Sequence, residues 1–118
     1  MSTVRSKYEI SLDHFVGETK TFTLSVKDPD TGGVLDMTNT TTYDTVDVKI
    51  IKADGTSVFT LTGTISNRSN GEVQFTVDGD TEATSANAGN HIGLIEVKNT
   101  SSKVTVKQAF NFNLIDLD

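Results

Sequence analysis

Apolar and polar residues alternate along several short segments of the chain, and turn-forming residues separate these segments at nearly even spacing. The first two segments are residues 6–12 and 19–28. Because successive side chains of a strand point to opposite faces, Tyr8, Ile10 and Leu12 share one face of the first strand. Repeated along the chain, this pattern predicts a β-sandwich in which one half of each strand enters the core.

Five further segments continue the alternation, at residues 43–52, 57–66, 72–78, 91–99 and 103–117. The side chains expected to point inward are Phe22, Leu24, Val26, Val46, Val48, Ile50, Phe59, Leu61, Ile65, Val73, Phe75, Val77, Ile92, Leu94 or Ile95, Val97, Val104, Val106, Phe110, Phe112 and Leu114. Gln108 also falls on an inward position, so a bend or bulge is expected near it. We expect residues 34–42 to form a short edge strand or a loop that crosses between the sheets.

The connections carry recognisable turn chemistry. Residues 28–33 read Asp-Pro-Asp-Thr-Gly-Gly, in which proline fixes one turn dihedral and glycine permits a positive φ. Asp54-Gly55 is typical of a hairpin, and residues 67–71 form another turn. At most one short helical turn is expected near residues 80–88, with Gly89 ending it. The sequence thus predicts an all-β fold, a single antiparallel β-sandwich of about seven or eight strands spanning residues 1–118.

Composition narrows the functions that the chain can serve. The net charge is −6, and Lys and Arg form no basic stripe. Binding to nucleic acid or to an anionic membrane is therefore not expected. The absence of cysteine removes disulfides, thiol catalysis and thiolate metal sites. No apolar stretch follows the N-terminal residues, so we expect synthesis in the cytoplasm without a signal peptide.

The residues that could carry chemistry do not form a catalytic or metal-binding pattern. A calcium loop counted from Asp28 would need an oxygen ligand at the fifth position and glutamate at the twelfth, where Gly32 and Asn39 stand. His14 and His91 lie far apart, and a structural or surface role is expected for both. Gly-x-Ser-x-Gly is absent, and the paired carboxylates fall in exposed turns. We expect no enzymatic activity, no cofactor and no metal.

Two other classes of function remain open. Sandwich modules that bind carbohydrate use exposed aromatic side chains as stacking platforms, and here Trp is absent while most Phe residues are expected inside. A carbohydrate or cell-surface binding module nevertheless stays an alternative, with Tyr43 as a candidate contact. A sandwich stiffened by calcium is the third option.

Three Asn-x-Ser/Thr triplets, beginning at Asn39, Asn67 and Asn99, are explained by the abundance of these residue types.

A series of motifs in a particular order supplies the functional expectation. In chain order these are residues 17–28, 33–38, 46–55, 70–77 and 88–97, closed by Phe110-Asn111-Phe112. The series resembles the immunoglobulin-like N-terminal domain of tailed-phage baseplate upper proteins and similar small virion β-sandwich proteins. That pattern has a Gly-Asp/Glu-Thr strand, an Asp-Leu-Thr segment, a Lys-x-Asp-Gly hairpin and an Ala-Gly-x-Tyr strand. Here Met37 replaces the Leu, and His91-Ile92 replace the aromatic residue.

The resemblance implies a non-enzymatic structural component of a tailed-phage virion, in the baseplate or tail, in the neck, or as a capsid decoration. Its location would be the virion, after synthesis in the host cytoplasm. Its partners would be other virion proteins and copies of itself in a symmetric assembly. The candidate docking surface comes from the N-terminal arm, the crossing segment and the C-terminal tail, and consists of Val4, Arg5, Lys7, Leu35, Met37, Tyr43 and Leu117.

Overall fold

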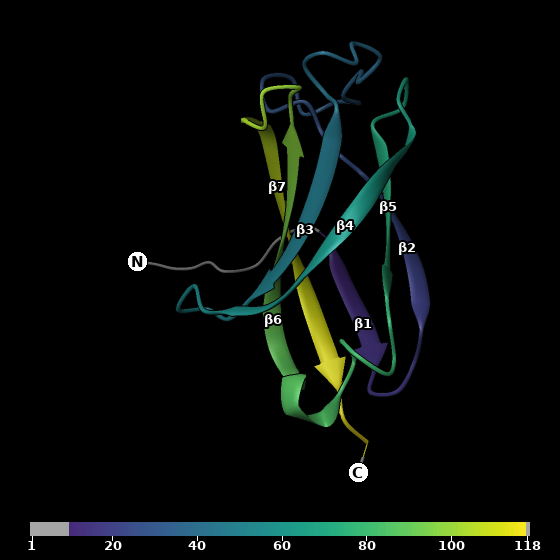
Figure 1. Ribbon diagram of the computed structural model, residues 1–118, viewed down its shortest axis with the longest axis vertical. Helices are drawn as coiled ribbons and strands as arrows, with labels where there is room; N and C mark the ends of the chain where they lie inside the picture. The colour runs from purple at the N-terminus through teal and green to yellow at the C-terminus, as the bar shows by residue number, and fades with distance from the viewer. Residues whose placement is uncertain (1–9, 118) are drawn as a thin grey trace.

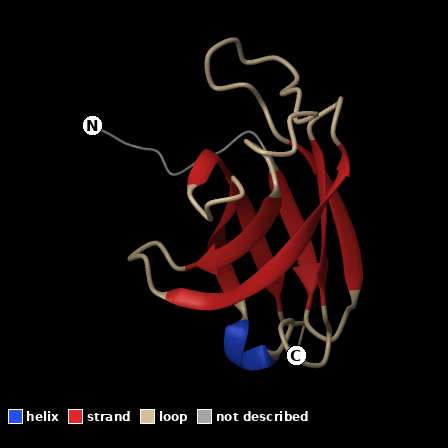
Figure 2. Ribbon diagram, turned by 45° about the horizontal axis from the view of Figure 1, so that its top comes forward, coloured by secondary structure: helices blue, strands red, loops and turns tan. Residues whose placement is uncertain are grey.

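The computed structural model describes residues 10–117, and it is an all-β structure (Figures 1 and 2). The described residues form seven strands: β1 (Ser11–Phe15), β2 (Lys20–Ser25), β3 (Thr45–Ile51), β4 (Ser57–Asn67), β5 (Glu72–Val77), β6 (Gly89–Lys98) and β7 (Val104–Ile115). A single 3-10 turn, η1 (Ser85–Asn87), lies within the region expected to form a helical turn. The predicted fold class is confirmed.

The strands are hydrogen-bonded in the order β1-β7-β6-β3-β4-β5-β2. One layer contains β1, β7, β6, β3 and the first part of β4, and the other contains the end of β4 with β5 and β2. All of these pairs are antiparallel except β1 with β7, which are parallel. The sandwich is therefore mixed at one edge rather than wholly antiparallel.

The core lies between the two layers and is built from the alternating apolar positions. Most of the side chains predicted to point inward are buried, including Phe22, Leu24, Val46, Val48, Ile50, Val73, Phe75, Val77, Phe110, Phe112 and Leu114. Phe59 and Ile65 are half-buried and pack against this core. Period-two alternation was sufficient to identify these positions, because one face of each strand is covered by the opposite sheet.

Strand β6 shows a different inward set from the one predicted. His91, Gly93, Ile95 and Val97 face the core, whereas Ile92 and Leu94 are half-buried on the outer face. Val97 is inward as predicted, and of the two alternatives Leu94 and Ile95 it is Ile95 that is inward. The prediction for Ile92 is wrong, because β6 carries apolar residues on both faces and its alternation is therefore ambiguous. The inward position 93 has to be glycine, because the ring of Phe110 occupies the space beside it and a Cβ there would lie 2.1 Å from Cζ of Phe110.

The two ends of the chain also differ from expectation. Strand β1 begins at Ser11 rather than residue 6, and residues 6–9 lie outside the described residues. The register along β6 and β7 shifts between Val97 and Lys98, so the extra residue of the bulge is Thr105 rather than a residue beside Gln108. Val104 lies beyond this bulge and is 41% exposed, contrary to its predicted inward position.

The crossing segment, residues 34–42, is a loop and contributes only an isolated bridge between Lys27 and Val34. Its Leu35 and Met37 side chains are buried, at 6% and 0% exposure, so they cannot belong to a docking surface. That part of the site prediction is wrong. The two side chains cover the open end of the sandwich, where apolar edges of both sheets would otherwise meet water.

Arg68 holds this loop in place from the turn between β4 and β5. Its Nη1 donates hydrogen bonds to the carbonyl oxygens of Met37 at 3.0 Å and Tyr43 at 2.6 Å. The backbone N–H of Met37 donates in turn to the Arg68 carbonyl at 2.8 Å. Gly71 allows the turn to approach the loop closely. It adopts φ +66°, and a Cβ there would lie 2.6 Å from the carbonyl oxygen of Leu35. The loop is thus a fixed part of the core.

We expect Met37→Ala to lower the free energy of unfolding by about 2–5 kcal/mol, as is typical for a large apolar side chain removed from a core. Val34→Ala is the matched control, because Val34 lies three residues away in the same loop and is 64% exposed. Its effect should stay within about 0.5 kcal/mol. Urea unfolding of both variants measures the difference, and equal effects would contradict a core role for Met37.

Candidate docking surfaces

The structure scatters the residues predicted to form a docking surface. Val4, Arg5 and Lys7 lie outside the described residues. Tyr43 is half-buried against the core, and Leu117 is 78% exposed near the C-terminal end of β7. Of the described candidates, Leu117 alone presents a largely exposed apolar side chain.

Sequence reasoning missed two apolar side chains at the ends of β1 and β7, Phe15 and Ile115, and we call these two residues together with the predicted Leu117 the apolar corner. Phe15 pairs with Ile115 in the parallel β1–β7 ladder. The backbone N–H of the following residue, Val16, donates a hydrogen bond to the carbonyl oxygen of Ile115 at 2.9 Å. Phe15 is 41% exposed and Ile115 is half-buried. Phe15 lies on β1, which is an edge strand of the described sheet (Figure 1). An exposed apolar edge of this kind favours association.

A second feature lies where β4 changes layers. Residues 57–63 of β4 pair with β3, and residues 64–67 pair with β5. Consequently, β4 and β5 diverge, and we call the opening between residues 57–63 of β4 and residues 75–77 of β5 the fork. Within the described residues, no strand pairs with the fork side of either stretch.

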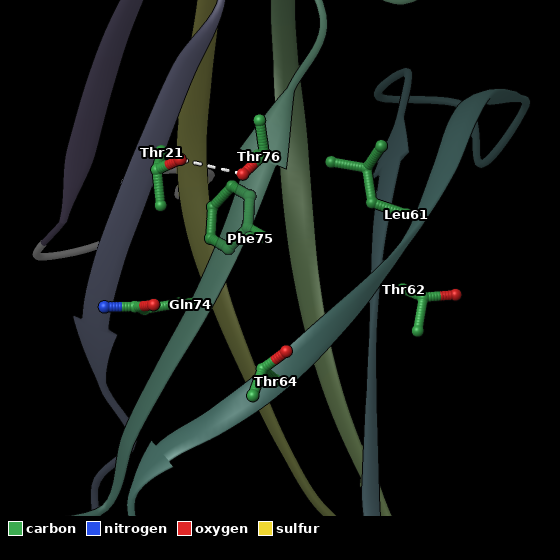
Figure 3. A pocket seen from close by; sticks show the side chains of 7 residues that line it. All are labelled: Thr21, Leu61, Thr62, Thr64, Gln74, Phe75 and Thr76. Atoms are coloured by element: carbon green, nitrogen blue, oxygen red, sulfur yellow. Dashed lines mark hydrogen bonds between the residues drawn. The ribbon is translucent and has the colours of Figure 1, made fainter.

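The fork contains a hollow of about 200 Å³ (Figure 3). Its lining residues are Thr21, Leu61, Thr62, Thr64, Gln74, Phe75 and Thr76. Leu61 and Phe75 are almost completely buried and provide an apolar floor, while hydroxyl and amide groups surround it. The Thr21 and Thr76 hydroxyls are 2.8 Å apart and hydrogen-bonded. The hollow is thus polar at the rim, apolar below and without a charged side chain in its lining.

Gly63 lets β4 pass from one layer to the other. A Cβ at this position would lie 3.0 Å from the carbonyl oxygen of Gln74 and 3.1 Å from Cγ1 of Val46. Those neighbours belong to β5 and β3, one in each layer. A side chain at residue 63 would therefore push the two sheets apart at the vertex of the fork.

The opposite side of the sandwich is closed by a side chain. Gln108 of β7 accepts a hydrogen bond from the Lys27 N–H at 2.8 Å and donates one to the Ser25 oxygen at 2.9 Å. The side-chain amide of Gln108 thus makes the same pair of hydrogen bonds with the end of β2 that a backbone peptide group of a neighbouring strand would make. This contact explains why glutamine occupies an inward position in an otherwise apolar series.

The two histidines have structural surroundings. His14 is fully buried between the rings of Phe22 and Phe112, and its Nε2 donates to the carbonyl oxygen of Glu18. His91 is 7% exposed, and its Nε2 donates to the Asn87 oxygen at 2.6 Å. Each ring therefore ties a strand to a neighbouring turn. Among residues 10–117, no three His, Cys, Asp or Glu side chains gather where a metal ion could bind.

The acidic loop considered for calcium is a turn. The Asp28 N–H donates to the Gly33 oxygen at 2.9 Å, and the Gly32 N–H donates back to the Asp28 oxygen at 2.8 Å. The Asp28 carboxylate accepts from the N–H of Asp30 at 2.8 Å. This carboxylate therefore stabilises the turn itself.

Within the described part of the chain, no helix is long and apolar enough to span a membrane.

A cluster of charges covers the outer face of the larger sheet. Glu96 is only 4% exposed although it points outward, because Lys49 and Lys107 lie over it at 2.9 and 3.3 Å. Lys98 and Asp47 form a neighbouring ion pair at 2.8 Å. Burial acts to raise the pKa of Glu96, but the hydrogen bonds and charges of the two lysines outweigh it and lower that pKa below 4.5.

This lowered pKa predicts a pH-dependent stability. The contribution of Glu96 is complete above its unfolded pKa, near 4.5, and is lost as the pH falls through the lower folded pKa. We expect Glu96→Gln to cost about 1–2 kcal/mol at pH 7, because the lysines are largely exposed and screening weakens the pairs. The cost should shrink toward pH 3. Urea unfolding at both pH values measures it, and an equal cost at both would contradict the assignment.

Comparison with known proteins leaves the function open. No protein-family model and no curated protein matches this sequence. Among solved structures, the crystal structure of CopC from Methylosinus trichosporium OB3b resembles this chain with a TM-score of 0.47 and 15% sequence identity. That alignment covers 92% of this chain and 88% of CopC. A likeness at this level carries no argument about function.

Proposed function

We propose that this protein is a non-enzymatic structural component of a tailed-phage virion, which docks other virion proteins and copies of itself in a symmetric assembly. The order of its sequence motifs resembles that of virion sandwich domains. The observation that carries the proposal is the apolar corner, in which Phe15 of the edge strand β1 and Leu117 beyond the end of β7 are exposed by 41% and 78%. An edge strand with apolar side chains gives a partner both unpaired backbone groups and surface to bury.

The roles of the polar residues support a docking function over a catalytic one. Within the described residues, His14 and His91 hold backbone carbonyls, and the Asp28 carboxylate stabilises its own turn. Catalysis needs a nucleophile or base that faces a substrate with its partners in reach. These groups are instead engaged in holding strands and turns together, which leaves the outer surface for recognition.

The carbohydrate-binding alternative has less support. Hydroxyl and amide groups line the fork, as a sugar site would require. However, Phe75 beneath them is only 2% exposed, so its ring face is not available for stacking. Protein docking therefore remains the proposal, and glycan-array binding that depends on the fork would favour the alternative.

Virions purified from infected cells should contain this protein when analysed by mass spectrometry. Recombinant Phe15→Glu and Leu117→Glu proteins should bind particles lacking the native copy at least about tenfold more weakly, since burying one such side chain is worth about 1.5–3 kcal/mol. Val34→Glu is the control, because Val34 is also exposed but lies in the loop at the opposite end of the sandwich. Absence from virions would eliminate the proposal, and equal losses in all three variants would remove the corner as its basis.

A further inference from the structure

We propose that this protein binds inorganic hydrogen phosphate in a second hollow, which lies at the end of the sandwich where β6 begins. This β6 hollow measures about 160 Å³, and its lining residues are Lys52, Ser57, Val58, Ala86, Asn87, Ala88 and His91. They come from the β3–β4 hairpin, from the turn η1 (blue in Figure 2) with the residue after it, and from the first part of β6. The proposal goes beyond the docking role and does not depend on it.

A buried nitrogen atom of a residue that lines this hollow lacks a hydrogen-bond partner. His91 is only 7% exposed. Its Nε2 donates to the Asn87 oxygen at 2.6 Å, so the ring proton is on Nε2 and Nδ1 carries a lone pair. Among residues 10–117, no donor reaches this Nδ1. A buried acceptor without a donor is costly, so we assign its missing donor to a group bound in the hollow.

The antiparallel register puts a lysine beside this histidine. The pairing of β3 with β6 ends with Ile51 opposite Ile92. The next residues along the two segments are Lys52 and His91, which are therefore opposed, and opposed residues have Cβ atoms about 4.5–5.5 Å apart. Ser57 begins the returning strand of the hairpin and pairs with Ile51. A cationic donor and a hydroxyl group thus accompany the Nδ1 acceptor at the hollow.

The charge and size of the hollow favour a small anion. Among the described residues that line it, Lys52 alone has a permanent charge and none is acidic. Asp54 belongs to the same hairpin, but its carboxylate accepts from the Thr56 N–H at 2.9 Å and stabilises the turn. The volume is close to the roughly 150 Å³ that holds a benzene molecule, and a phosphate ion is smaller than benzene.

Hydrogen phosphate matches each of the polar groups. Its P–O–H group donates to the lone pair of Nδ1, and its anionic oxygens accept from the Lys52 ammonium and the Ser57 hydroxyl. Sulfate has a similar shape, but it carries no proton at neutral pH and would place an oxygen lone pair against that of Nδ1. Phosphate monoesters are mainly dianions without a P–O–H group at pH 7, since their second pKa is about 6. The lone pair therefore selects inorganic phosphate over both.

The test is a titration of the full-length protein with sodium phosphate at pH 7 and constant ionic strength, followed by the nitrogen chemical shifts of the histidine rings. We expect the Nδ1 signal of His91 to shift with a dissociation constant of about 1 mM or lower. His14 is the internal control, because its Nδ1 is also buried without a partner but His14 does not line the hollow. Its signal should stay unchanged.

Sodium sulfate and methyl phosphate are the matched ligands, and they distinguish the free ion from a phosphate group carried by another molecule. Each should bind at least about tenfold more weakly than inorganic phosphate. The reason is that sulfate lacks the proton that Nδ1 accepts, and methyl phosphate has lost it in most molecules at pH 7.

Two lysine variants separate the hollow from the rest of the surface. Lys52→Met should weaken phosphate binding at least about tenfold, because it removes the charged donor and keeps a side chain of similar length. Lys103→Met removes an exposed lysine outside the hollow and should bind phosphate as the wild type does. Circular dichroism should show the same β-spectrum for both variants.

The inference is overturned if phosphate leaves the Nδ1 signal of His91 unchanged, or if the signal of His14 moves with the same constant. It is also overturned if sulfate or methyl phosphate binds as tightly as inorganic phosphate, because the lone pair then selects nothing. Equal phosphate binding by Lys52→Met and Lys103→Met would likewise contradict it. None of these outcomes affects the proposed function, which depends on the presence of the protein in virions.

Discussion

One strand, β4, has to serve both layers of this sandwich, and the rest of the architecture follows from that constraint. Its first half completes the larger sheet beside β3 and its last residues begin the smaller sheet beside β5. The passage works because Gly63 has no side chain to collide with Gln74 and Val46. A strand that turns away from its neighbour leaves backbone groups of both strands unpaired, and the fork is the direct result.

The remaining openings of the sandwich are closed by polar side chains used as structural parts. Gln108 substitutes for a neighbouring strand, Arg68 holds the loop that covers one end, and His14 and His91 tie strands to turns. Each of these groups has a chemistry that could serve catalysis or metal binding elsewhere. Here their hydrogen bonds are directed at backbone atoms, so these side chains hold strands, turns and the covering loop together.

Alternation along the sequence was enough to predict the fold class and most of the core, because strands such as β3 and β5 are apolar on one face only. It failed in part for β6, where apolar residues stand on both faces and the ring of Phe110 occupies the space beside the inward Gly93. It also failed for Leu35 and Met37, since burial in a loop follows from tertiary contacts with Arg68 rather than from a local period.

The candidate surfaces were less accessible to sequence reasoning than the core. Leu117 was predicted, but its companions Phe15 and Ile115 became visible only when parallel pairing brought the ends of β1 and β7 together. The sequence did contain a signal for this pair. On one face of β1, polar Ser11 and Asp13 are followed by apolar Phe15, and β7 likewise ends on apolar Ile115. The fork had no such signal, because it depends on where β4 changes partner.

Amide hydrogen exchange of dilute, monomeric protein tests the central claim most directly. If β4 leaves β5 as described, the amides of residues 75–77 and 57–63 that face the fork should exchange at least about tenfold faster than the paired amides of residues 64–67 and 72–74. Strong and equal protection along all of these stretches would mean that β4 and β5 pair over their full length. That result would contradict the fork and the account built on it.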